Sequence, residues 1–391
     1  MMKDTYVLGM ARTPVGSFGG SLSKISAVDL GAHSIRHAIA NAGVSAEDVE
    51  EVFMGQVLQA GSGQAPARQA ALSAGLSAST PCTTINKVCA SGMKSIMLAS
   101  QAIRLGDRSL MVAGGMESMS QAPYYVLEGR WGAKYGNKNL IDGIVRDGLQ
   151  DPYDGSMMGV CGDLCAEEQG FDREAQDEYA IASYKRAQEA SNAGFFKAEI
   201  APVEIPQRKG DPLSVFRDED IDKVKFDKIP TLRPVFNKEG SVTAANASNI
   251  NDGAAALVLG SDKWTSQHKP LARILSYADA AQTPNQFTMA PSVAMPIALE
   301  KAGIQASQVD LVEINEAFSV VALANMKTLG FSHDITNVNG GGVSIGHPIG
   351  VSGCRIVMAL ISELRRRGKR YGLAGICNGG GGASAMVIEA L

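Results

Sequence analysis

The residues that decide the fold run from Thr83 to Lys94 and read TTINKVCASGMK. A short strand-like run leads into Cys89, and from there to about Gly106 apolar residues recur at helical spacing. We expect a mostly buried helix whose first turn lies beneath the thiol. Because unpaired N–H groups at a helix N-terminus favour negative charge, this position predicts a lowered pKa and a nucleophilic thiolate for Cys89. The alternative is that Cys89 is a small core residue, since free cysteines are often buried.

Bulk composition bounds the class of protein. The chain has 391 residues, of which 45% are hydrophobic and 19% charged, which is typical of a soluble globular protein of about two or three domains. The net charge of −4 arises from 36 basic and 40 acidic residues with no basic stripe. It therefore gives no support to a nucleic-acid or membrane-surface partner. No apolar run reaches the roughly 20 residues that a membrane helix needs.

The cysteines and the chain ends indicate in which cellular compartment the protein is expected. The 6 cysteines of the chain, which has no signal peptide, favour a reducing compartment over a disulfide framework. A strand-like run at Tyr6–Gly9 begins almost at once and leaves no room for a targeting presequence. The C-terminal residues Glu389-Ala390-Leu391 are not a peroxisomal signal. We expect a cytoplasmic protein, or an organelle protein in its mature form.

Strand-like and helix-like segments alternate along the first hundred or so residues, which indicates an α/β layer architecture. The strand-like segments are Tyr6–Gly9, Val52–Val57, Thr83–Ile85 and Leu110–Ala113, and the helix-like ones are about 27–42, 64–74 and 90–106.

The same pattern occurs twice. Residues 42–52 align without gaps on residues 302–312, and the sequence SGMK that starts at Ser91 matches SGCR starting at Ser352. In both copies a strand and a group of glycines follow. We infer a duplicated α/β unit whose halves pack about a pseudo-twofold axis. One half is 1–115, completed by about 251–270, and the other is 271–391.

The repeat breaks down over 116–250, where one amphipathic helix is expected at about Glu174–Asn192. We interpret this segment as an inserted loop or substrate-binding domain. Its basic residues alternate with acidic ones, so they form either a solvated surface or a site for a phosphate-bearing ligand. These basic residues are Arg208, Lys209, Arg217, Lys223, Lys225 and Lys228.

Two polar groups stand at strand-to-helix junctions in the second half. Asn315 lies where a buried strand turns into a helix expected at 318–329, the usual place for ligands in open α/β sheets. It is equally well explained as an ordinary N-cap. His347 lies in the glycine-rich segment 340–350, just before a helix, and is a candidate general base.

A second thiol, Cys377, ends the predicted strand Tyr371–Ile376 and is followed by the glycines 379–382. Their N–H groups can form an oxyanion hole. Together Cys89, Cys377, His347 and Asn315 supply a nucleophile, a second acid/base, a general base and an oxyanion donor. This set suits carbon–carbon chemistry on a thioester, because one thiolate carries the acyl group while the other moves a proton at the neighbouring carbon.

Two other groups resemble metal sites only superficially. His33 and His37 lie four residues apart on a predicted helix, but no carboxylate or cysteine is near them in the sequence, so we interpret them as helix-face residues. Cys161 and Cys165 lack the spacing partners of a zinc site and are interpreted as structural thiols.

Four motifs resemble the active-site motifs of thiolases in the right order: NKVCASG at 86–92, NEAF at 315–318, GHP at 346–348 and CNGGG at 377–381. The resemblance runs from about Thr5 to Leu391. It implies the duplicated thiolase fold, acyl-CoA substrates and no required metal or redox cofactor, with CoA as substrate and product.

The resemblance also implies roles for the site residues. Cys89 carries the acetyl group, His347 activates it, and Cys377 deprotonates the second acetyl-CoA. Asn315, through a water, and His347 bind the thioester oxygen of the substrate. The N–H groups of Cys89 and Gly379 hold the oxygen of the acyl-enzyme.

Within the family the chain is most similar to the potassium-activated acetoacetyl-CoA thiolases of animal mitochondria. This likeness implies a mitochondrial matrix protein lacking its presequence, otherwise a cytoplasmic one, and a homotetramer built as a dimer of dimers. The implied potassium ligands are Tyr184, Ala244, Ala245, Ala247 and Val343. The implied CoA contacts are Tyr184, Lys228, Ser248, Met158, Lys223 and Phe318.

The chain departs from that subfamily at two places. Met157 replaces the usual histidine before Met158, and the Phe-Pro pair linked to branched substrates is present as Phe287-Thr288. Acetoacetyl-CoA alone, or also 2-methylacetoacetyl-CoA, is therefore the expected substrate. The alternatives are a broad-range 3-ketoacyl-CoA thiolase, a decarboxylating ketoacyl synthase, against which Cys377 argues, and a non-catalytic acyl-CoA-binding scaffold.

Overall fold

One sheet runs through the whole computed structural model, which describes residues 3–391. Its ten strands follow the order β12-β13-β14-β11-β1-β10-β5-β3-β4, with β2 paired to β10. The strands are β1 (Thr5–Arg12), β2 (Gly16–Ser17), β3 (Glu51–Gly55), β4 (Cys82–Ile85), β5 (Leu110–Ser118), β10 (Asn251–Gly260), β11 (Ala272–Ala281), β12 (Leu311–Ile314), β13 (Tyr371–Asn378) and β14 (Gly382–Ala390).

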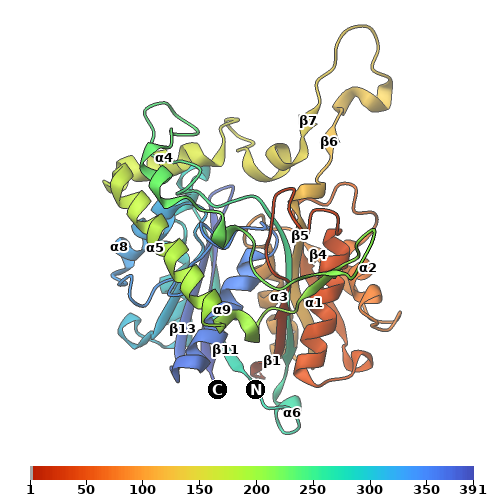
Figure 1. The fold of residues 1–391 in the computed structure, drawn as a ribbon. Helices are drawn as coiled ribbons and strands as arrows, with labels where there is room; N and C mark the ends of the chain where they lie inside the picture. Colours follow the sequence, from red (N-terminus) through yellow and green to blue (C-terminus); the bar gives the residue numbers. More distant parts are fainter. Residues whose placement is uncertain (1–2) are drawn as a thin grey trace.

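Helices cover the sheet in layers (Figure 1). Two of them, α3 and α9, pack against each other between the two halves of the sheet, and their apolar side chains share one core with both halves. The outer face of the first half is covered by α1 and α2, and that of the second half by α7 and α8. The helices are α1 (Ala27–Ala42), α2 (Pro66–Ser73), α3 (Ser91–Leu105), α4 (Met158–Gln169), α5 (Arg173–Asn192), α6 (Asp262–Thr265), α7 (Pro291–Ala302), α8 (Ser319–Leu329) and α9 (Ser352–Arg367).

The strand pairing confirms the predicted duplication. In the first half β3 is parallel to β5, and β10 is antiparallel to both β5 and β1. In the second half β12 is parallel to β13, and β14 is antiparallel to both β13 and β11. Even the bulges correspond, at Leu8 in β1 and at Leu275 in β11. β10, which follows the inserted segment in the chain, therefore pairs with two strands of the first half.

The two halves join where β1 and β11 pair antiparallel. The paired residues are Thr5 with Ile274, Tyr6 with Arg273 and Val7 with Ala272. We call this pairing the seam.

The aligned repeat of residues 42–52 and 302–312 marks equivalent helix ends. α1 begins at the N-cap Ser26, whose side chain accepts from the Asp29 N–H, and ends at Gly43 with φ 67°. α7 likewise ends at Gly303 with φ 67°. Glycine adopts this left-handed conformation without a Cβ penalty, so it ends both helices at the same point of the repeat.

Two glycines, Gly114 and Gly115, lie inside a strand and not after it as expected. The prediction put Gly114 and Gly115 after a strand ending at Ala113, but β5 continues through both to Ser118. A Cβ on Gly114 would lie 2.0 Å from the Ala255 oxygen, and one on Gly115 would lie 2.0 Å from the Gly350 oxygen. Both glycines are therefore needed inside the strand: Gly114 lets β10 approach closely, and Gly115 lets the loop that carries His347 pack against β5.

The inserted segment contains α4, α5 and two hairpins, with α4 at one end of the layers and α5 running across their front (Figure 1). The first hairpin, β6 (Tyr124–Tyr125) with β7 (Ile141–Asp142), projects away from the layered body, and the second pairs β8 (Val203–Ile205) with β9 (Leu213–Val215). Within residues 3–391, no helix combines the length and the apolar character that crossing a membrane requires.

Candidate active site

Cys89 is presented by a strained turn immediately before α3. Val88 has φ 48°, a left-handed conformation that is a genuine outlier for a β-branched residue. The turn is held locally because the Val88 N–H donates to Asn86 Oδ1 at 3.0 Å and the Lys87 N–H donates to Ser91 Oγ at 2.8 Å. The predicted strand-to-helix junction is confirmed, with the thiol two residues ahead of the helix.

The two predicted cysteines lie close together. The N–H groups of Gly379 and of Cys89 itself lie close enough to the Cys89 thiol to act on its pKa. The Cys377 thiol lies close enough to Cys89 and Cys165 that negative charge on either raises its pKa. The two thiols come from opposite halves of the duplicated fold, one before α3 and the other in β13.

His347 and Asn315 lie side by side at the same end of the sheet. Asn315 donates its backbone N–H to the Gly375 oxygen at 2.9 Å, which places it beside β13, two residues before Cys377. Its side-chain nitrogen lies 3.5 Å from His347 Nε2. Asn315 Oδ1 is buried and has no hydrogen-bond partner within residues 3–391. The N-cap alternative is wrong, because α8 begins at Ser319 behind Phe318.

The ring of His347 is oriented by Ser352. Ser352 Oγ lies 2.6 Å from His347 Nδ1 and donates to the Pro348 oxygen at 3.2 Å. The hydroxyl therefore accepts from Nδ1–H, which leaves Nε2 as the basic nitrogen facing Asn315. The His347 N–H donates to Asn251 Oδ1 at 2.9 Å, which fixes the loop.

Burial keeps all three reactive groups neutral at rest. Desolvation raises the pKa of Cys89 to about 11, although the N–H groups of Gly379 and Cys89 act in the opposite direction. Desolvation also raises the pKa of Cys377 well above its ordinary value. It lowers the pKa of His347 to about 3, with a further contribution from Arg355. The predicted lowered pKa of Cys89 is therefore wrong, because burial outweighs the helix N-terminus.

Alkylation of the free protein tests this neutrality. Because only the thiolate reacts and pH 7 to 9 lies well below a pKa of about 11, the rate at Cys89 should rise about tenfold per pH unit. A lowered pKa would instead give a plateau. The measurement is iodoacetamide labelling followed by mass spectrometry of the Cys89 peptide, with the half-buried Cys82 as the internal comparison.

Two buried carboxylates that the sequence analysis missed hold the site loops. Glu316 accepts from Tyr179, Ser183, Asn337 and the Val343 N–H, at 2.8 to 3.1 Å.

The second carboxylate, Glu117, accepts from the N–H groups of Val57, Leu58 and Gly350, at 2.9 to 3.1 Å. Burial raises its pKa to about 7. A signal was present for Glu316, since it is an acidic residue beside Asn315 at the end of an apolar strand. No such signal marks Glu117.

Most of the residues predicted to bind CoA and potassium line two adjoining pockets beside α5, whereas Val343, Phe318 and Met158 line neither. One pocket is lined by Tyr184, Lys223, Lys228, Ala244 and Ala245. The adjoining pocket is lined by Lys223, Ala244, Ala247 and Ser248. Val343 packs against Tyr184, and Phe318 forms a β-bridge with Ala247. Met158 lies closer to the thiols, since a Cβ on Gly379 would meet its sulfur at 3.5 Å.

The predicted potassium ligands have free oxygens. Within residues 3–391, no hydrogen bond is accepted by the carbonyl oxygens of Ala244, Ala245, Ala247 or Val343. Burial raises the pKa of Tyr184 to about 12, so its phenol is a neutral oxygen ligand. Carbonyl and phenol oxygens of this kind replace the hydration shell of a potassium ion, and the residues present therefore fit that ion.

The groups set aside as metal sites remain structural. His33 Nε2 lies 3.2 Å from the Ala201 oxygen, and the rings of His33 and His37 lie 4.4 Å apart. Cys161 and Cys165 are buried. In the described part of the chain, no three histidine, cysteine or acidic side chains form a group that could hold a metal ion.

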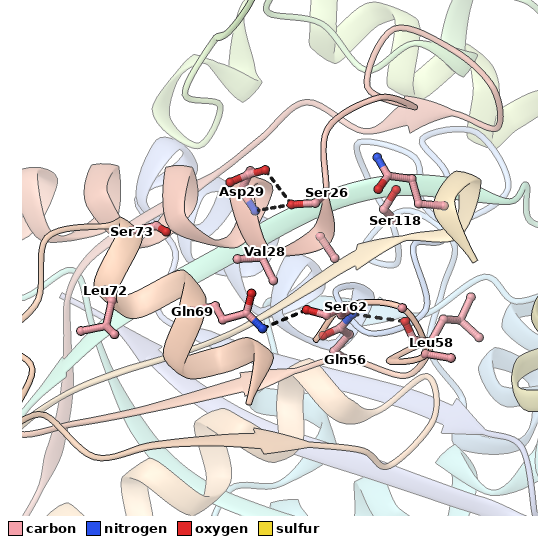
Figure 2. Close-up of a pocket in the computed structure, with 14 residues that line it drawn as sticks. Ser26, Val28, Asp29, Gln56, Leu58, Ser62, Gln69, Leu72, Ser73 and Ser118 are labelled. Atoms are coloured by element: carbon pink, nitrogen blue, oxygen red, sulfur yellow. Dashed lines mark hydrogen bonds between the residues drawn. The ribbon is translucent and has the colours of Figure 1, made fainter. Parts of the chain in front are cut away.

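A polar pocket elsewhere carries none of the predicted residues. It lies between α1, α2 and the loop after β3 (Figure 2). Asp29 is the one ionisable residue among those that line it, and it accepts from the hydroxyl of Ser26 at 2.7 Å. Gln69 and Gln56 instead bond to the loop at Ser62. We assign no chemistry to this pocket.

Comparison with known proteins gives matches over the whole length. The family described as thiolase, N-terminal domain, matches residues 5–263, and thiolase, C-terminal domain, matches residues 268–390. A probable acetyl-CoA acetyltransferase of Dictyostelium discoideum is 54% identical, over 100% of this chain and 95% of that protein. A cytosolic acetyl-CoA acetyltransferase, ERG10, of Gibberella zeae is 54% identical, over 100% and 99%.

An acetyl-CoA acetyltransferase of Schizosaccharomyces pombe is 53% identical, over 99% of this chain and 98% of that protein. Among solved structures, the Acat5 thiolase from Ascaris suum in complex with coenzyme A superposes with a TM-score of 0.94. It is 43% identical, and the match covers 100% of both chains.

Proposed function

Because the chain belongs to the thiolase family, we propose that it is an acetyl-CoA acetyltransferase. It condenses two acetyl-CoA molecules to acetoacetyl-CoA and CoA, and it runs the thiolysis in reverse. The observation that carries the proposal is that the thiols of Cys89 and Cys377 lie close together, with the N–H of Gly379 beside Cys89. The relatives described as acetyl-CoA acetyltransferases support the choice of substrate.

The first half-reaction acetylates Cys89. The neutral His347 Nε2 accepts the thiol proton as the sulfur attacks the carbonyl carbon of acetyl-CoA, so charge arises only during the reaction. The N–H groups of Cys89 and Gly379 stabilise the oxyanion. Loss of CoA, which takes the proton from His347, leaves an acetyl-thioester on Cys89 and a neutral His347.

The second half-reaction forms the carbon–carbon bond. Cys377 first gives its thiol proton to the neutral His347 Nε2 and then, as thiolate, removes a proton from the methyl group of a second acetyl-CoA. His347 and a water bound to the free Oδ1 of Asn315 stabilise the enolate oxygen. The carbanion attacks the acetyl group on Cys89, and the released sulfur takes the proton held by His347, which restores the resting state. A decarboxylating ketoacyl synthase would not need this second catalytic cysteine.

The direct test is the CoA-dependent loss of the magnesium-enolate absorbance of acetoacetyl-CoA. The rate with this substrate should exceed that with a long 3-ketoacyl-CoA. A comparable rate with the long chain would indicate a broad-range thiolase, and no turnover would indicate a non-catalytic scaffold. The same assay with 2-methylacetoacetyl-CoA decides substrate breadth, because the Phe-Pro pair linked to branched substrates is present here as Phe287-Thr288.

Potassium is proposed as an activator, held by Tyr184 and by the free carbonyl oxygens near it. We expect faster turnover and a higher Tm in KCl than in NaCl at equal ionic strength, because an ion that binds only the folded state stabilises it. Tyr184→Phe should bring the K⁺/Na⁺ ratio of rates closer to one. Equal rates and equal Tm values in the two salts with the unaltered protein would remove the proposal.

A homotetramer, as a dimer of dimers, is proposed from two exposed features. β4 is an edge strand of the sheet, available for pairing with a second copy. The hairpin of β6 and β7 exposes large apolar side chains, which mark interaction sites. Those on the hairpin are Tyr124 (61%), Leu127 (58%), Trp131 (80%), Tyr135 (104%) and Leu140 (69%).

The hairpin can be tested separately from the edge strand. Trp131→Ser should shift the sedimentation coefficient from that of a tetramer to that of a dimer, because it removes the apolar contact between dimers. Phe216→Ser, which removes an apolar residue exposed to 66% elsewhere, should leave the tetramer intact. A tetrameric Trp131→Ser variant would contradict this use of the hairpin.

The narrower subfamily and the compartment stay predictions. A mitochondrial matrix location follows from the likeness to the potassium-activated enzymes, whereas one of the matched relatives is described as cytosolic. Cell fractionation with a C-terminal tag would distinguish the two.

A further inference from the structure

We propose that Lys87 is a positioning residue that sets the separation between the sulfurs of Cys89 and Cys377. The inference rests on the roles proposed above for the two cysteines. Lys87 precedes the nucleophile by two residues, and its side chain crosses from the first half of the fold to the second.

All three donor positions of the Lys87 ammonium are used. Nζ donates to Asp279 Oδ1 at 2.5 Å, to Ser384 Oγ at 2.8 Å and to the Ala383 oxygen at 3.1 Å. Ala383 is the residue paired with Cys377 across β13 and β14. The ammonium of a residue in the Cys89 turn is therefore bound directly to the strand partner of Cys377.

The partner carboxylate is itself fixed. Asp279 lies opposite Ser384 in the pairing of β11 and β14, and Ser384 Oγ donates to it at 2.7 Å. Burial opposes its ionisation, but hydrogen bonds from Lys87, Lys94 and Ser384 lower the pKa of Asp279 to about 2. The carboxylate is therefore charged throughout the neutral range, in a site where the Lys87 side chain is only 24% exposed.

The turn needs such an external attachment. A β-branched residue with left-handed φ persists only where its surroundings over-determine the conformation. The local bonds of Asn86 and Ser91 shape the turn, but both residues belong to the first half of the fold. Lys87 connects this turn to the strands on the Cys377 side, so the turn cannot shift against Cys377 without breaking an ion pair.

Lys94 provides a matched control. Its Nζ also donates to Asp279, at 2.6 Å, and its side chain is 25% exposed. Lys94 lies within α3, however, and makes no hydrogen bond to β14. Lys94→Met therefore removes a similar cation from the same carboxylate while leaving the bond between the Cys89 turn and β14.

The experiment compares Lys87→Met with Lys94→Met in the full-length protein, using kinetics and a dithiol probe. Phenylarsine oxide binds two neighbouring thiols through one arsenic atom with loss of water, so its affinity reports the separation of the sulfurs. For Lys87→Met we expect kcat to fall on the order of 10²-fold, as a shift of about 1 Å can cause, with KM for acetyl-CoA little changed. The affinity of this variant for phenylarsine oxide should fall by at least as large a factor as kcat.

The outcomes are separable. Lys94→Met should retain both kcat and arsenical affinity, and Cys377→Ser should abolish the bridged adduct. Unchanged arsenical affinity in Lys87→Met, equal losses in Lys94→Met, or no bridged adduct with the unaltered protein would each overturn the inference. If Lys87→Met does not fold, the same two measurements on Lys87→Gln test the inference. An inactive unaltered protein would contradict the proposed function, whereas an active one with a normal Lys87→Met variant contradicts only the role of Lys87.

Discussion

Cys377→Ser is expected to stop condensation and thiolysis while Cys89 still takes up an acetyl group. Serine keeps the shape of the buried site but has a far higher pKa, so it cannot remove a proton from the methyl group of acetyl-CoA. Loss of a general acid/base of this kind costs on the order of 10²–10⁴-fold in rate. Turnover is measured with acetoacetyl-CoA, and the acetyl group on Cys89 by mass spectrometry of the quenched protein.

The control for this substitution is Cys165→Ser, because Cys165 is the other buried thiol whose charge would act on Cys377. It should retain condensation, since no step of the proposed mechanism uses it. A fully active Cys377→Ser variant would show that the second acid/base lies elsewhere and would reopen the ketoacyl synthase alternative.

Cys89→Ala is expected to have the largest effect, because no acetyl-enzyme can form without the sulfur. Removal of a catalytic nucleophile costs on the order of 10⁶-fold in kcat, which here means no detectable turnover and no protein-bound acetyl group. Binding of CoA should remain, since the predicted CoA pockets are lined by other residues. Isothermal calorimetry with CoA and a turnover assay measure the two properties on the same preparation.

Cys82→Ala separates loss of the nucleophile from loss of a thiol in general. Cys82 is half-buried on the edge strand β4 and is not among the site residues, so this variant should keep its rate. Residual acetylation in Cys89→Ala, mapped to another cysteine, would contradict the assignment of the nucleophile.

Local sequence predicted the elements whose ends are determined locally. The helix expected at 27–42 has these bounds in the structure, because Ser26 caps its start and Gly43 ends it. The helix expected at 174–192 starts one residue earlier, at Arg173, behind the N-cap Asp172. Such signals act over three or four residues and are therefore visible in a single sequence.

What the sequence analysis missed depends on contacts between distant segments. Glu117 is hydrogen-bonded to residues 57, 58 and 350. β5 extends beyond Ala113 because residues 114–118 pair with residues 252–256 of β10, a strand distant in the sequence. The pKa of Cys89 was predicted with the wrong sign for the same reason: the helix N-terminus is a local feature, whereas desolvation is produced by every element packed around the thiol.

The seam between β1 and β11 bears on the origin of the chain. If the bulged residues Leu8 and Leu275 are equivalent, Tyr6 and Arg273 are also equivalent and face each other, and the pairs on either side exchange roles. This reciprocity is the signature of an isologous contact between identical subunits. Two copies of a half-length ancestor would join their sheets in the same way, and fusion of their genes would then free each copy to specialise. One copy now has Cys89 at the position where the other has Gly350. A symmetric fold therefore carries an asymmetric active site.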